Sequence, residues 1–486
     1  MSLELSRADA ADRLRNAELD VLVVGGGIVG AGIARDAAMR GLRTALVEQY
    51  DLASGTSSRS SRLLHGGLRY LAQGRLGLVY ESSREKMILH RIASHLAEPL
   101  PFLFPTYRGT HWPLWQLRIG VKVYDLLCGG RNLGRSTSLP PEGVIEQLPG
   151  VRRNGLTGAV RYFDALTNDA RLVIDTVRSA ARHGAIVLNY VRLEDAARRP
   201  GGWRCRLNDA VGARQSEVLA RCVVNAAGPW AATLPHSRVR LRLTKGVHLV
   251  IDRQRLPVPS AVVMTHQRRI LFAIPWGERV ILGTTDTDYA GPPEAVDAES
   301  DDVNYILAVI NGAFPSAKIE PRDVISHWAG LRPLIVSRRG GPSDISRAHQ
   351  IRMCEPGWLD VAGGKLTTYR LIAQQAVDRL LPHLDRPAAR CRTAEEPLLV
   401  PGAATLASGI LPQPVGADAV RHFCEHEWAL HLDDVMIRRS GWHYYHPDAA
   451  DLAERTAGWM AEVLGWDRAQ QQAELASYCE RCQRRF

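Results

Sequence analysis

The stretch DVLVVGGGIVGAGIARDAAMRGLRTALVE, residues 20–48, decides the fold. It opens with an apolar, β-branched run of strand length at 20–24, and a glycine-rich turn leads from that run into a helix over about 27–40. Gly41 ends the helix, and TALVE follows as a second strand. A strand, a glycine turn, a helix and a second strand in this order predict a parallel sheet with helices packed on it.

The glycines of the turn have the spacing G-x-G-x-x-G, at Gly25, Gly27 and Gly30. This spacing combines a tight turn, a close backbone approach to a pyrophosphate and close packing of helix on strand. The helix that follows would point its N–H groups and its positive dipole end at the phosphates. Glu48 ends the second strand about twenty residues later, where a carboxylate bonds ribose hydroxyls and repels a 2′-phosphate. We therefore expect a bound dinucleotide, and an ordinary tight glycine turn is the alternative.

A second informative stretch, SGTSSRSSRLLHGGLRYL at 54–71, comes directly after the nucleotide-binding segment. Its hydroxyls and glycines suit a loop that lies against a planar, phosphorylated cofactor. His65 offers a proton acceptor, while Arg69 and Tyr70 offer groups that hold an anion. We expect a cofactor and an anionic substrate to meet at this loop.

Composition places the chain among ordinary globular proteins, with 486 residues of which 45% are hydrophobic and 23% charged. No run approaches the roughly 18 apolar residues of a membrane span. The polar N-terminal segment has no apolar core that would mark it for secretion, so we expect a cytoplasmic protein. Cys479 and Cys482 form one C-x-x-C, but no second pair or nearby histidine cluster completes a zinc site, so we predict no metal and free thiols.

The formal net charge of +10 favours anionic partners. Nucleic acid ranks last among them, because the chain has no basic tail and no recognised nucleic-acid motif. Only five of the 61 basic residues are lysines. A lysine in a glycine-rich motif therefore suggests a need for a compact ammonium, and Lys245 in TKGVHLV and Lys365 in GGKLTTYR are the two such cases.

Further motifs follow along the chain. The segment NAAGPW at 225–230 ends a predicted strand with small residues that permit close approach to a ligand. Apolar, β-rich runs separated by Gly and Pro fill 246–289 and predict an antiparallel sheet that forms a substrate wall. The turn VAGGKLTTYR at 361–370 begins another helix whose N-terminus can stabilise negative charge, and an ordinary glycine-initiated helix is the alternative. Residues 384–418 form a predicted linker rich in Pro, Ala and Gly, and 419–486 a small helical domain.

Seven motifs in order identify a resemblance: TSSRSSRLLHGGLRYL, NAAGPW, TKGVHLV, ILGTTDTDY, HWAGLRPL, ISRAHQ and VAGGKLTTYR. With them the chain resembles FAD-dependent glycerol-3-phosphate dehydrogenase, densely over 17–383 and only faintly over 391–486. The resemblance implies an α/β fold of the glycine or D-amino-acid oxidase type. In that fold a Rossmann-like, parallel-sheet FAD domain is interleaved with an antiparallel-sheet substrate domain.

This resemblance divides the chain into discontinuous parts. The FAD-binding parts are expected at about 17–75, 155–230 and 350–383. The substrate parts are expected at about 76–154 and 231–349. A small C-terminal helical domain would follow these parts.

The resemblance also implies an activity, namely oxidation of sn-glycerol 3-phosphate to dihydroxyacetone phosphate with non-covalent FAD and transfer of the electrons to a membrane quinone. Three readings stay open beside it. The first is a glycerol-3-phosphate oxidase that forms hydrogen peroxide. The second is a dehydrogenase of another polyol phosphate, and the third is a non-catalytic flavin-binding sensor. A nicotinamide dehydrogenase is less favoured, because its fold gives the hydroxyl loop and GGKLTTYR no role.

Site residues follow from the matching motifs. His65 is the expected base for the hydroxyl proton and His248 is its rival, while Arg332 and Lys365 place positive charge beside the developing alkoxide and the reduced flavin. The expected substrate contacts are Arg69, Tyr70, Thr285, Arg347 and His349. The expected cofactor contacts are Gly25, Gly27, Gly30, Glu48, Thr56, Ser57, Ser58, Gly66, Gly67, Ala227, Gly228, Trp230, Gly364, Leu366 and Thr367.

A last segment bears on location. WPLWQLRIGVKVY at 112–124 mixes Trp112, Trp115, Ile119, Val121 and Tyr124 with Arg118 and Lys122. This composition suits a helix that lies in a headgroup layer of anionic lipid, although a helix that packs its aromatic side in the core has the same composition. Together with the quinone, the segment predicts a peripheral protein on the inner face of the cytoplasmic membrane. A homodimer is possible.

Overall fold

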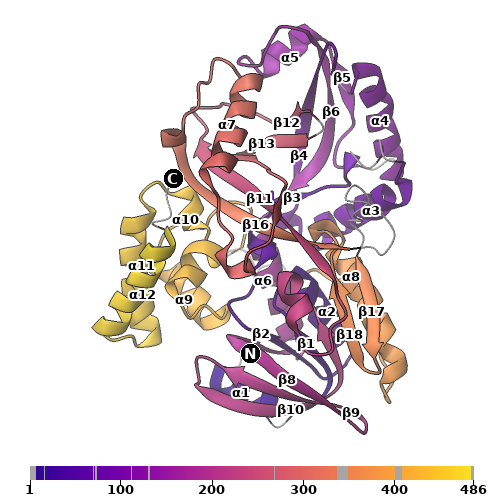
Figure 1. Ribbon diagram of the computed structural model, residues 1–486, viewed down its shortest axis with the longest axis vertical. Coiled ribbons are helices and arrows are strands. Elements are labelled where there is room, and N and C mark those ends of the chain that lie inside the picture. Colours follow the sequence, from indigo (N-terminus) through magenta and orange to yellow (C-terminus); the bar gives the residue numbers. More distant parts are fainter. Residues whose placement is uncertain are drawn as a thin grey trace.

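The computed structural model describes residues 7–15, 17–68, 71, 74–110, 112–129, 132–267, 269–336, 349–399 and 408–482. Two sheets dominate it, one in the lower and one in the upper half of Figure 1, with C-terminal helices at their flank. The α/β fold predicted from the sequence is confirmed, with a mixed sheet and a mainly antiparallel sheet. The exact domain boundaries stay a prediction.

The lower sheet has the strand order β17-β18-β10-β1-β2-β7. Its strands are β1 (Glu18–Val24), β2 (Thr44–Glu48), β7 (Ile186–Asn189), β10 (Arg214–Asn225), β17 (Gln350–Glu355) and β18 (Trp358–Ala362). β1 pairs in parallel with both β2 and β10, while β17 runs antiparallel to β18. A meander of β8 (Val191–Arg199) and β9 (Gly202–Asp209) continues from β10.

Burial on both faces explains why β1 is apolar throughout. Val21 and Val23 lie in the core beneath α2 (Ile28–Met39), α6 (Asp169–Arg182) and α8 (Tyr369–Leu380). Leu22 and Val24 point to the other face, where the meander and α1 (Arg7–Arg15) cover them. A parallel strand covered on both faces needs an unbroken apolar run, as the sequence has.

The upper sheet has the order β15-β11-β14-β13-β12-β4-β6-β3, with β16 on β11 and β5 on β6. Its strands are β3 (Leu63–Leu64), β4 (Glu98–Tyr107), β5 (Thr137–Leu139), β6 (Leu156–Leu166), β11 (Leu241–Asp252), β12 (Ala261–His266), β13 (Arg269–Trp276), β14 (Arg279–Gly283), β15 (Thr287–Tyr289) and β16 (Val324–Ile335). All its pairs are antiparallel except β12 with β4. α5 (Pro141–Gln147) and α7 (Ser300–Ala313) cover one face, and α3 (Leu76–Ile92) and α4 (Leu114–Leu127) pack on the other.

Helix α4 corrects part of the lipid-facing prediction. Val121 and Tyr124 are buried in the core, and Trp112 packs on Phe104. Only part of the segment is therefore available to a partner, because a helix that covers a sheet must bury one of its faces.

The C-terminal helices form a separate small core. They are α9 (Ala417–His426), α10 (Trp442–Tyr445), α11 (Ala449–Leu464) and α12 (Arg468–Cys482), with a π-helical turn, η10 (Asp434–Arg439). The helices gather around Phe423, Trp442 and Met460. Figure 1 shows them in yellow beside both sheets, and α6 contacts η10 while β16 contacts α10.

Candidate active site

A groove of about 450 Å³ lies at the carboxyl ends of β1, β2 and β10. β1 has a parallel neighbour on each side, and a crevice beside such a strand is where open α/β sheets bind ligands. The predicted residues that line the groove are Gly25, Gly27, Glu48, Thr56, Ser57, Ala227, Gly228, Trp230, Gly364, Lys365 and Leu366. The groove thus joins three segments that are far apart in the sequence.

The glycine turn has no room for side chains. Gly25 has a φ of +117°, and a Cβ there would lie 2.5 Å from the carbonyl oxygen of Ala226. A Cβ on Gly30 would lie 1.9 Å from the carbonyl oxygen of Gly25. Gly27 stands at the N-cap of α2, so the N-terminal end of this helix opens toward the groove. These features fit a pyrophosphate.

Glu48 closes the end of β2. Its carboxylate accepts hydrogen bonds from the backbone N–H of Gly26 at 2.6 Å and of Tyr50 at 2.9 Å. Burial raises the pKa of Glu48, and these two N–H groups act against that rise. A carboxylate fixed at the groove wall fits the hydroxyls of a ribose.

The hydroxyl loop joins the groove to the upper sheet. Ser57 Oγ accepts from the N–H of Ile28 at 3.0 Å, and Thr56 Oγ1 donates to the carbonyl oxygen of Leu331 at 2.6 Å. Farther along, Ser61 Oγ lies 2.8 Å from Nε2 of His248. The groove and the upper sheet therefore meet along this loop.

His248, Thr285 and Arg332 come together on the upper sheet. Arg332 donates from Nη2 to Thr284 Oγ1 at 3.0 Å and to the carbonyl oxygen of Thr285 at 3.2 Å. Its guanidinium lies across Gly246, where a Cβ would be 2.3 Å from Nη2. Gly246 and His248 are two residues apart on β11 and share one face of the sheet, so the guanidinium and the imidazole are neighbours.

The environment of His248 keeps its imidazole neutral. The ring is buried and stacks on Trp328, with 5.3 Å between the ring centroids. Burial, together with the positive charges of Arg332 and Arg62, lowers the pKa of His248 to about 3. Nδ1 has no hydrogen-bond partner in the part of the chain that the structure describes. A neutral imidazole can accept a proton.

Lys365, Thr367 and His65 form a second cluster on the other side of the loop. Lys365 Nζ donates to Ser82 Oγ of α3 at 3.2 Å and also lines the groove. Thr367 Oγ1 accepts from the backbone N–H of His65 at 3.1 Å. The backbone of His65 is thus tied to the start of α8, and its side chain is half-buried.

Other predicted residues lie outside the groove lining. These are Gly30, Ser58, His65, Gly66, Gly67, His248, Thr285, Arg332 and Thr367, together with His349, whose Nε2 lies 2.7 Å from Gln375 Oε1. Gly66 ties the loop to α4, since its N–H donates to the hydroxyl of Tyr124 at 2.8 Å. Arg69, Tyr70 and Arg347 lie outside the described residues.

Sequence reasoning missed a whole wall of the groove. Val191, Arg192, Leu193 and Glu194 of β8 line it, as do Ser60 and Pro333. Nothing in the VRLEDAARR sequence distinguishes it from any half-exposed strand. Only the position of β8 beside β2 brings it to the groove.

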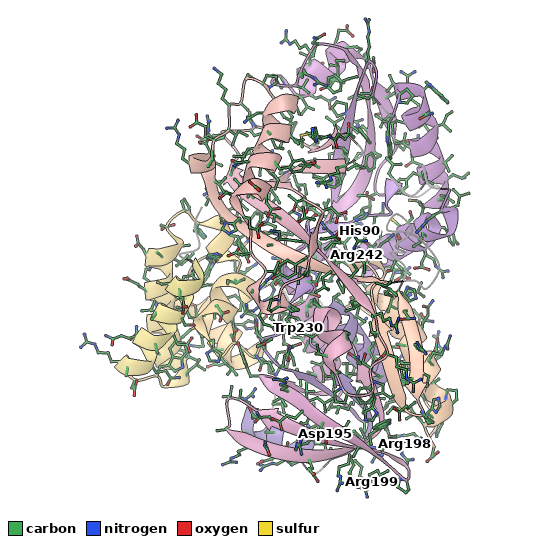
Figure 2. All side chains as sticks on the ribbon, in the orientation of Figure 1. His90, Asp195, Arg198, Arg199, Trp230 and Arg242 are labelled. Carbon is green, nitrogen blue, oxygen red and sulfur yellow. The ribbon has the colours of Figure 1, made fainter. Side chains whose placement is uncertain are left out.

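Trp230 connects the groove to the upper half of the molecule. Its indole N–H donates to the carboxylate of Glu294, and Tyr50 donates to the same carboxylate at 3.3 Å. Figure 2 shows Trp230 near the middle of the molecule, well above the meander that carries Asp195, Arg198 and Arg199. Trp230 and Glu48 both line the groove, and the carboxylate of Glu48 accepts from the backbone N–H of Tyr50.

No helix among the residues that the structure describes is both long and apolar enough to cross a membrane. Across the same ranges no group of three or more His, Cys, Asp or Glu side chains could hold a metal ion.

Comparisons with known proteins give a consistent result. A family model described as FAD dependent oxidoreductase matches residues 20–370, and one described as C-terminal domain of alpha-glycerophosphate oxidase matches 411–471. The aerobic glycerol-3-phosphate dehydrogenase of Staphylococcus epidermidis is 39% identical over 396 residues, covering 79% of this chain and 71% of its own. Glycerol-3-phosphate dehydrogenase 2 of Mycobacterium tuberculosis is 35% identical, covering 98% of this chain and 90% of its own.

Solved structures agree with the sequence relatives. The glycerol-3-phosphate dehydrogenase from Bacillus halodurans complexed with FAD has a TM-score of 0.77 and 28% identity, covering 97% of this chain and 96% of its own. The L-alpha-glycerophosphate oxidase from Mycoplasma pneumoniae with FAD bound has a TM-score of 0.61 at 19% identity, covering 77% of this chain and 96% of its own, which is a likeness of fold alone.

Proposed function

Since this chain belongs to the FAD-dependent glycerol-3-phosphate dehydrogenase family, with FAD as its cofactor, we propose that it oxidises sn-glycerol 3-phosphate to dihydroxyacetone phosphate and passes the electrons to a membrane quinone. The observation that carries the proposal is the hydroxyl loop, which lines the cofactor groove at Thr56 and Ser57 and reaches His248 at Ser61. A cofactor and a proton acceptor on neighbouring elements are what oxidation of an alcohol requires.

The residues of the groove fit FAD. The turn at Gly25 and the N-terminus of α2 would hold the pyrophosphate, and Glu48 would hold the ribose. The backbone at Gly364 and Leu366 would lie beside the ring system, where the following helix adds positive potential. FAD, when bound, supplies the acceptor for the hydride.

For the proton acceptor we choose His248 over His65. Its neutral ring lies beside Arg332, which can stabilise the developing alkoxide and so offset the low proton affinity that burial and nearby cations give the imidazole. Lys365 lines the groove and would add positive charge beside the reduced ring system. His65 stays the alternative base.

Phosphate recognition is assigned to Arg69, Tyr70 and Arg347. A guanidinium can bind a phosphate through two parallel hydrogen bonds, which gives orientation as well as affinity. Thr285 and His349 are weaker candidates for substrate contacts. In this assignment the phosphate anchors the substrate so that its secondary alcohol faces His248.

The electron acceptor needs a surface at the bilayer, and the exposed faces of α3 and α4 supply a candidate. Leu76 and Tyr80 of α3 are about half exposed, while Trp115 and Ile119 of α4 are more so, at 61% and 58%. Leu126 extends the same surface and is 74% exposed. We name these five residues the apolar patch.

Positive charge accompanies the apolar patch. Arg118 and Lys122 are exposed on the same helix as Trp115 and Ile119. Apolar side chains beside cations suit the headgroup layer of an anionic membrane, and docking there brings the enzyme to a lipid-soluble quinone. This arrangement supports a peripheral position on the inner face of the cytoplasmic membrane.

The test is anaerobic reduction of the purified, yellow holoenzyme. Glycerol 3-phosphate should bleach the flavin within seconds, and erythritol phosphate should do so far more slowly. Reoxidation by a quinone analogue should outpace reoxidation by oxygen. A flavin that stays oxidised with every polyol phosphate yet bleaches with dithionite would indicate a non-catalytic flavoprotein, and rapid peroxide formation would indicate an oxidase.

A further inference from the structure

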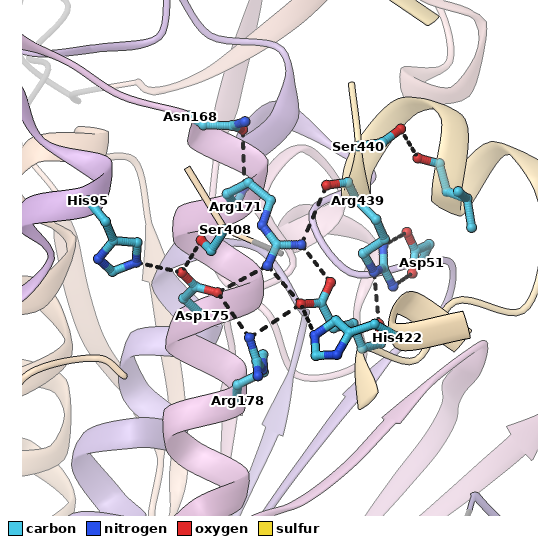
Figure 3. Close-up of polar contacts among 12 residues, drawn as sticks. Asp51, His95, Asn168, Arg171, Asp175, Arg178, Ser408, His422, Arg439 and Ser440 are labelled. Carbon is cyan, nitrogen blue, oxygen red and sulfur yellow. Dashed lines mark hydrogen bonds and ion pairs between the residues drawn. The ribbon is translucent and has the colours of Figure 1, made fainter. Parts of the chain in front are cut away.

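A buried ionic network joins the C-terminal region to the cofactor side of the molecule. Figure 3 shows its centre, with α6 contributing Arg171, Asp175 and Arg178. From the C-terminal region come Glu427 and Arg439, which are 0% and 1% exposed. Nothing in the proposed chemistry uses these charges.

Asp51 is the member that follows β2 and Glu48 in the chain. Arg439 holds its carboxylate with both terminal nitrogens, at 2.7 Å each, and Arg438 donates to the same carboxylate through Nε. Asn189 adds a hydrogen bond of 3.1 Å. Burial disfavours the charge on Asp51, but Arg439 and Arg438 outweigh it and hold its pKa below the ordinary value.

Asp51 itself does not line the groove, but the backbone on both sides of it does. Glu48 lines the wall three residues before it, and Ser54 to Ser57 line the wall after it. Between them, the N–H of Ala53 donates to the carbonyl oxygen of Gly26 at 3.0 Å, next to the phosphate-binding turn. Holding Asp51 therefore fixes the middle of the segment that contacts the cofactor.

A second connection reaches the far end of the same segment. Glu427 accepts two hydrogen bonds from Arg171 of α6, at 2.5 and 2.7 Å. At the start of α6, Asp169 accepts from the N–H and the hydroxyl of Ser60, at 2.9 and 2.7 Å. Ser60 lines the groove. The backbone oxygen of Glu427 also accepts from Arg439 Nε at 2.8 Å, so both connections start from one point.

The energetics favour a positioning role over a purely stabilising one. Removing two charges from water costs several kcal/mol per ion, so a buried ion pair is weak evidence of stability. Such a pair does define geometry, because a guanidinium that binds a carboxylate through two parallel hydrogen bonds fixes both position and orientation. A network of this kind is best understood by what it holds in place.

We propose that Arg439 and Asp51 are positioning residues of the FAD site. Through this pair the C-terminal region holds backbone 48–60 in the shape that receives FAD. Without this pair the segment samples other conformations. The apparent Kd of FAD then rises, because it equals the intrinsic Kd divided by the fraction of molecules in the competent shape. The inference rests on FAD as the cofactor and is independent of the substrate.

The experiment measures FAD affinity and not turnover. Wild type, Arg439→Gln, Asp51→Asn and the double variant are diluted as holoenzymes, and release of FAD is followed by recovery of its fluorescence. We expect each single variant to raise the Kd of FAD about tenfold or more. The double variant should bind no more weakly than the weaker single variant, because each single variant already breaks the Arg439–Asp51 pair.

Thermal unfolding separates positioning from simple destabilisation. Free FAD at a concentration c stabilises the folded protein by RT ln(1 + c/Kd), so the rise of Tm with added FAD reports binding. The rise should be smaller in the Arg439 and Asp51 variants. Arg279→Gln is the matched control. Arg279 lies on β14 of the upper sheet, ties that sheet to the C-terminal region by donating to the carbonyl oxygen of Tyr445 at 2.8 Å, and does not line the groove. Arg279→Gln should lower Tm by the same amount with and without FAD, so the rise of Tm on adding FAD should match that of the wild type.

Arg439→Lys provides a version of the test that keeps the buried charge. Lysine lacks the two-pronged donor, so FAD affinity should fall while folding persists. This variant decides the matter if Arg439→Gln does not fold. Wild-type Kd of FAD in the folded variants, with a Tm loss like that of Arg279→Gln, would overturn the proposal and leave the network a purely structural joint.

Discussion

Replacement of His248 by glutamine tests the proposed chemistry most directly. In the wild type, Ser61 Oγ lies 2.8 Å from Nε2 of His248. Glutamine keeps a hydrogen-bonding side chain of similar length toward Ser61, but its amide cannot act as a base. Loss of a general base costs roughly 10²- to 10⁴-fold in rate, or about 3 to 5 kcal/mol. We expect this loss in the rate of flavin reduction by glycerol 3-phosphate, measured anaerobically in a stopped-flow instrument.

The matched variant is His65→Gln. His65 is fixed through its backbone to Thr367, so the substitution leaves that contact in place. It should cost much less than His248→Gln in the same assay. Flavin reduction within about threefold of wild type in His248→Gln, with a severe defect in His65→Gln, would refute the assignment and make His65 the base.

The same variant tests the shifted pKa of His248. The pKa is about 3 in the folded protein and near 6.5 in an unfolded chain, so the unfolded state binds a proton that the folded state does not. Stability of the wild type should therefore fall as pH falls below 6.5, by up to about 1.4 kcal/mol per pH unit from this residue. His248→Gln lacks this dependence, and denaturant unfolding at pH 6 and pH 4.5 measures it. Parallel pH dependence in the two proteins would show that His248 is not shielded as the structure indicates.

Further predictions concern the substrate, the cofactor and the membrane. Arg347→Ala should raise the KM for glycerol 3-phosphate by the equivalent of about 2 to 5 kcal/mol, and unchanged affinity would remove it from the phosphate site. Lys365→Ala should slow flavin reduction and leave substrate affinity near wild type, as a kcat and KM comparison would show. Gly30→Val should give protein that purifies without flavin absorbance, since a Cβ there meets a backbone oxygen at 1.9 Å. The double variant Trp115→Ser with Ile119→Ser should stay soluble in a flotation assay with anionic vesicles while reducing a water-soluble dye at the wild-type rate, and flotation like wild type would argue against the apolar patch.

The parts of the site that the sequence predicted are those built by neighbouring residues. The spacing of Gly25, Gly27 and Gly30 carries its geometry within one turn, and the carboxylate of Glu48 ends an adjacent strand. Such features depend on local backbone sterics, which a sequence pattern records. The same holds for the start of α8 at the GGKLTTYR motif.

The parts that the sequence did not predict depend on pairing over long distances. Arg192 reaches the groove only because β8 lies beside β2, and Ser61 meets His248 across 187 residues of chain. Asp51 and Arg439 are 388 residues apart, and no local pattern indicates that they meet. Val121 and Tyr124 show the converse error, because an amphipathic segment does not reveal which face the rest of the fold will cover.

The strand order of the lower sheet also constrains how the protein is made. β1 and β2 are synthesised first. β10, which pairs with the other edge of β1, ends at Asn225, and β18, which pairs with β10, ends only at Ala362. A nascent chain thus carries an apolar strand edge through most of its synthesis, when intermolecular pairing competes with folding. We expect the growing chain to need chaperones until about three quarters of it has left the ribosome, and cofactor capture to follow release rather than accompany translation.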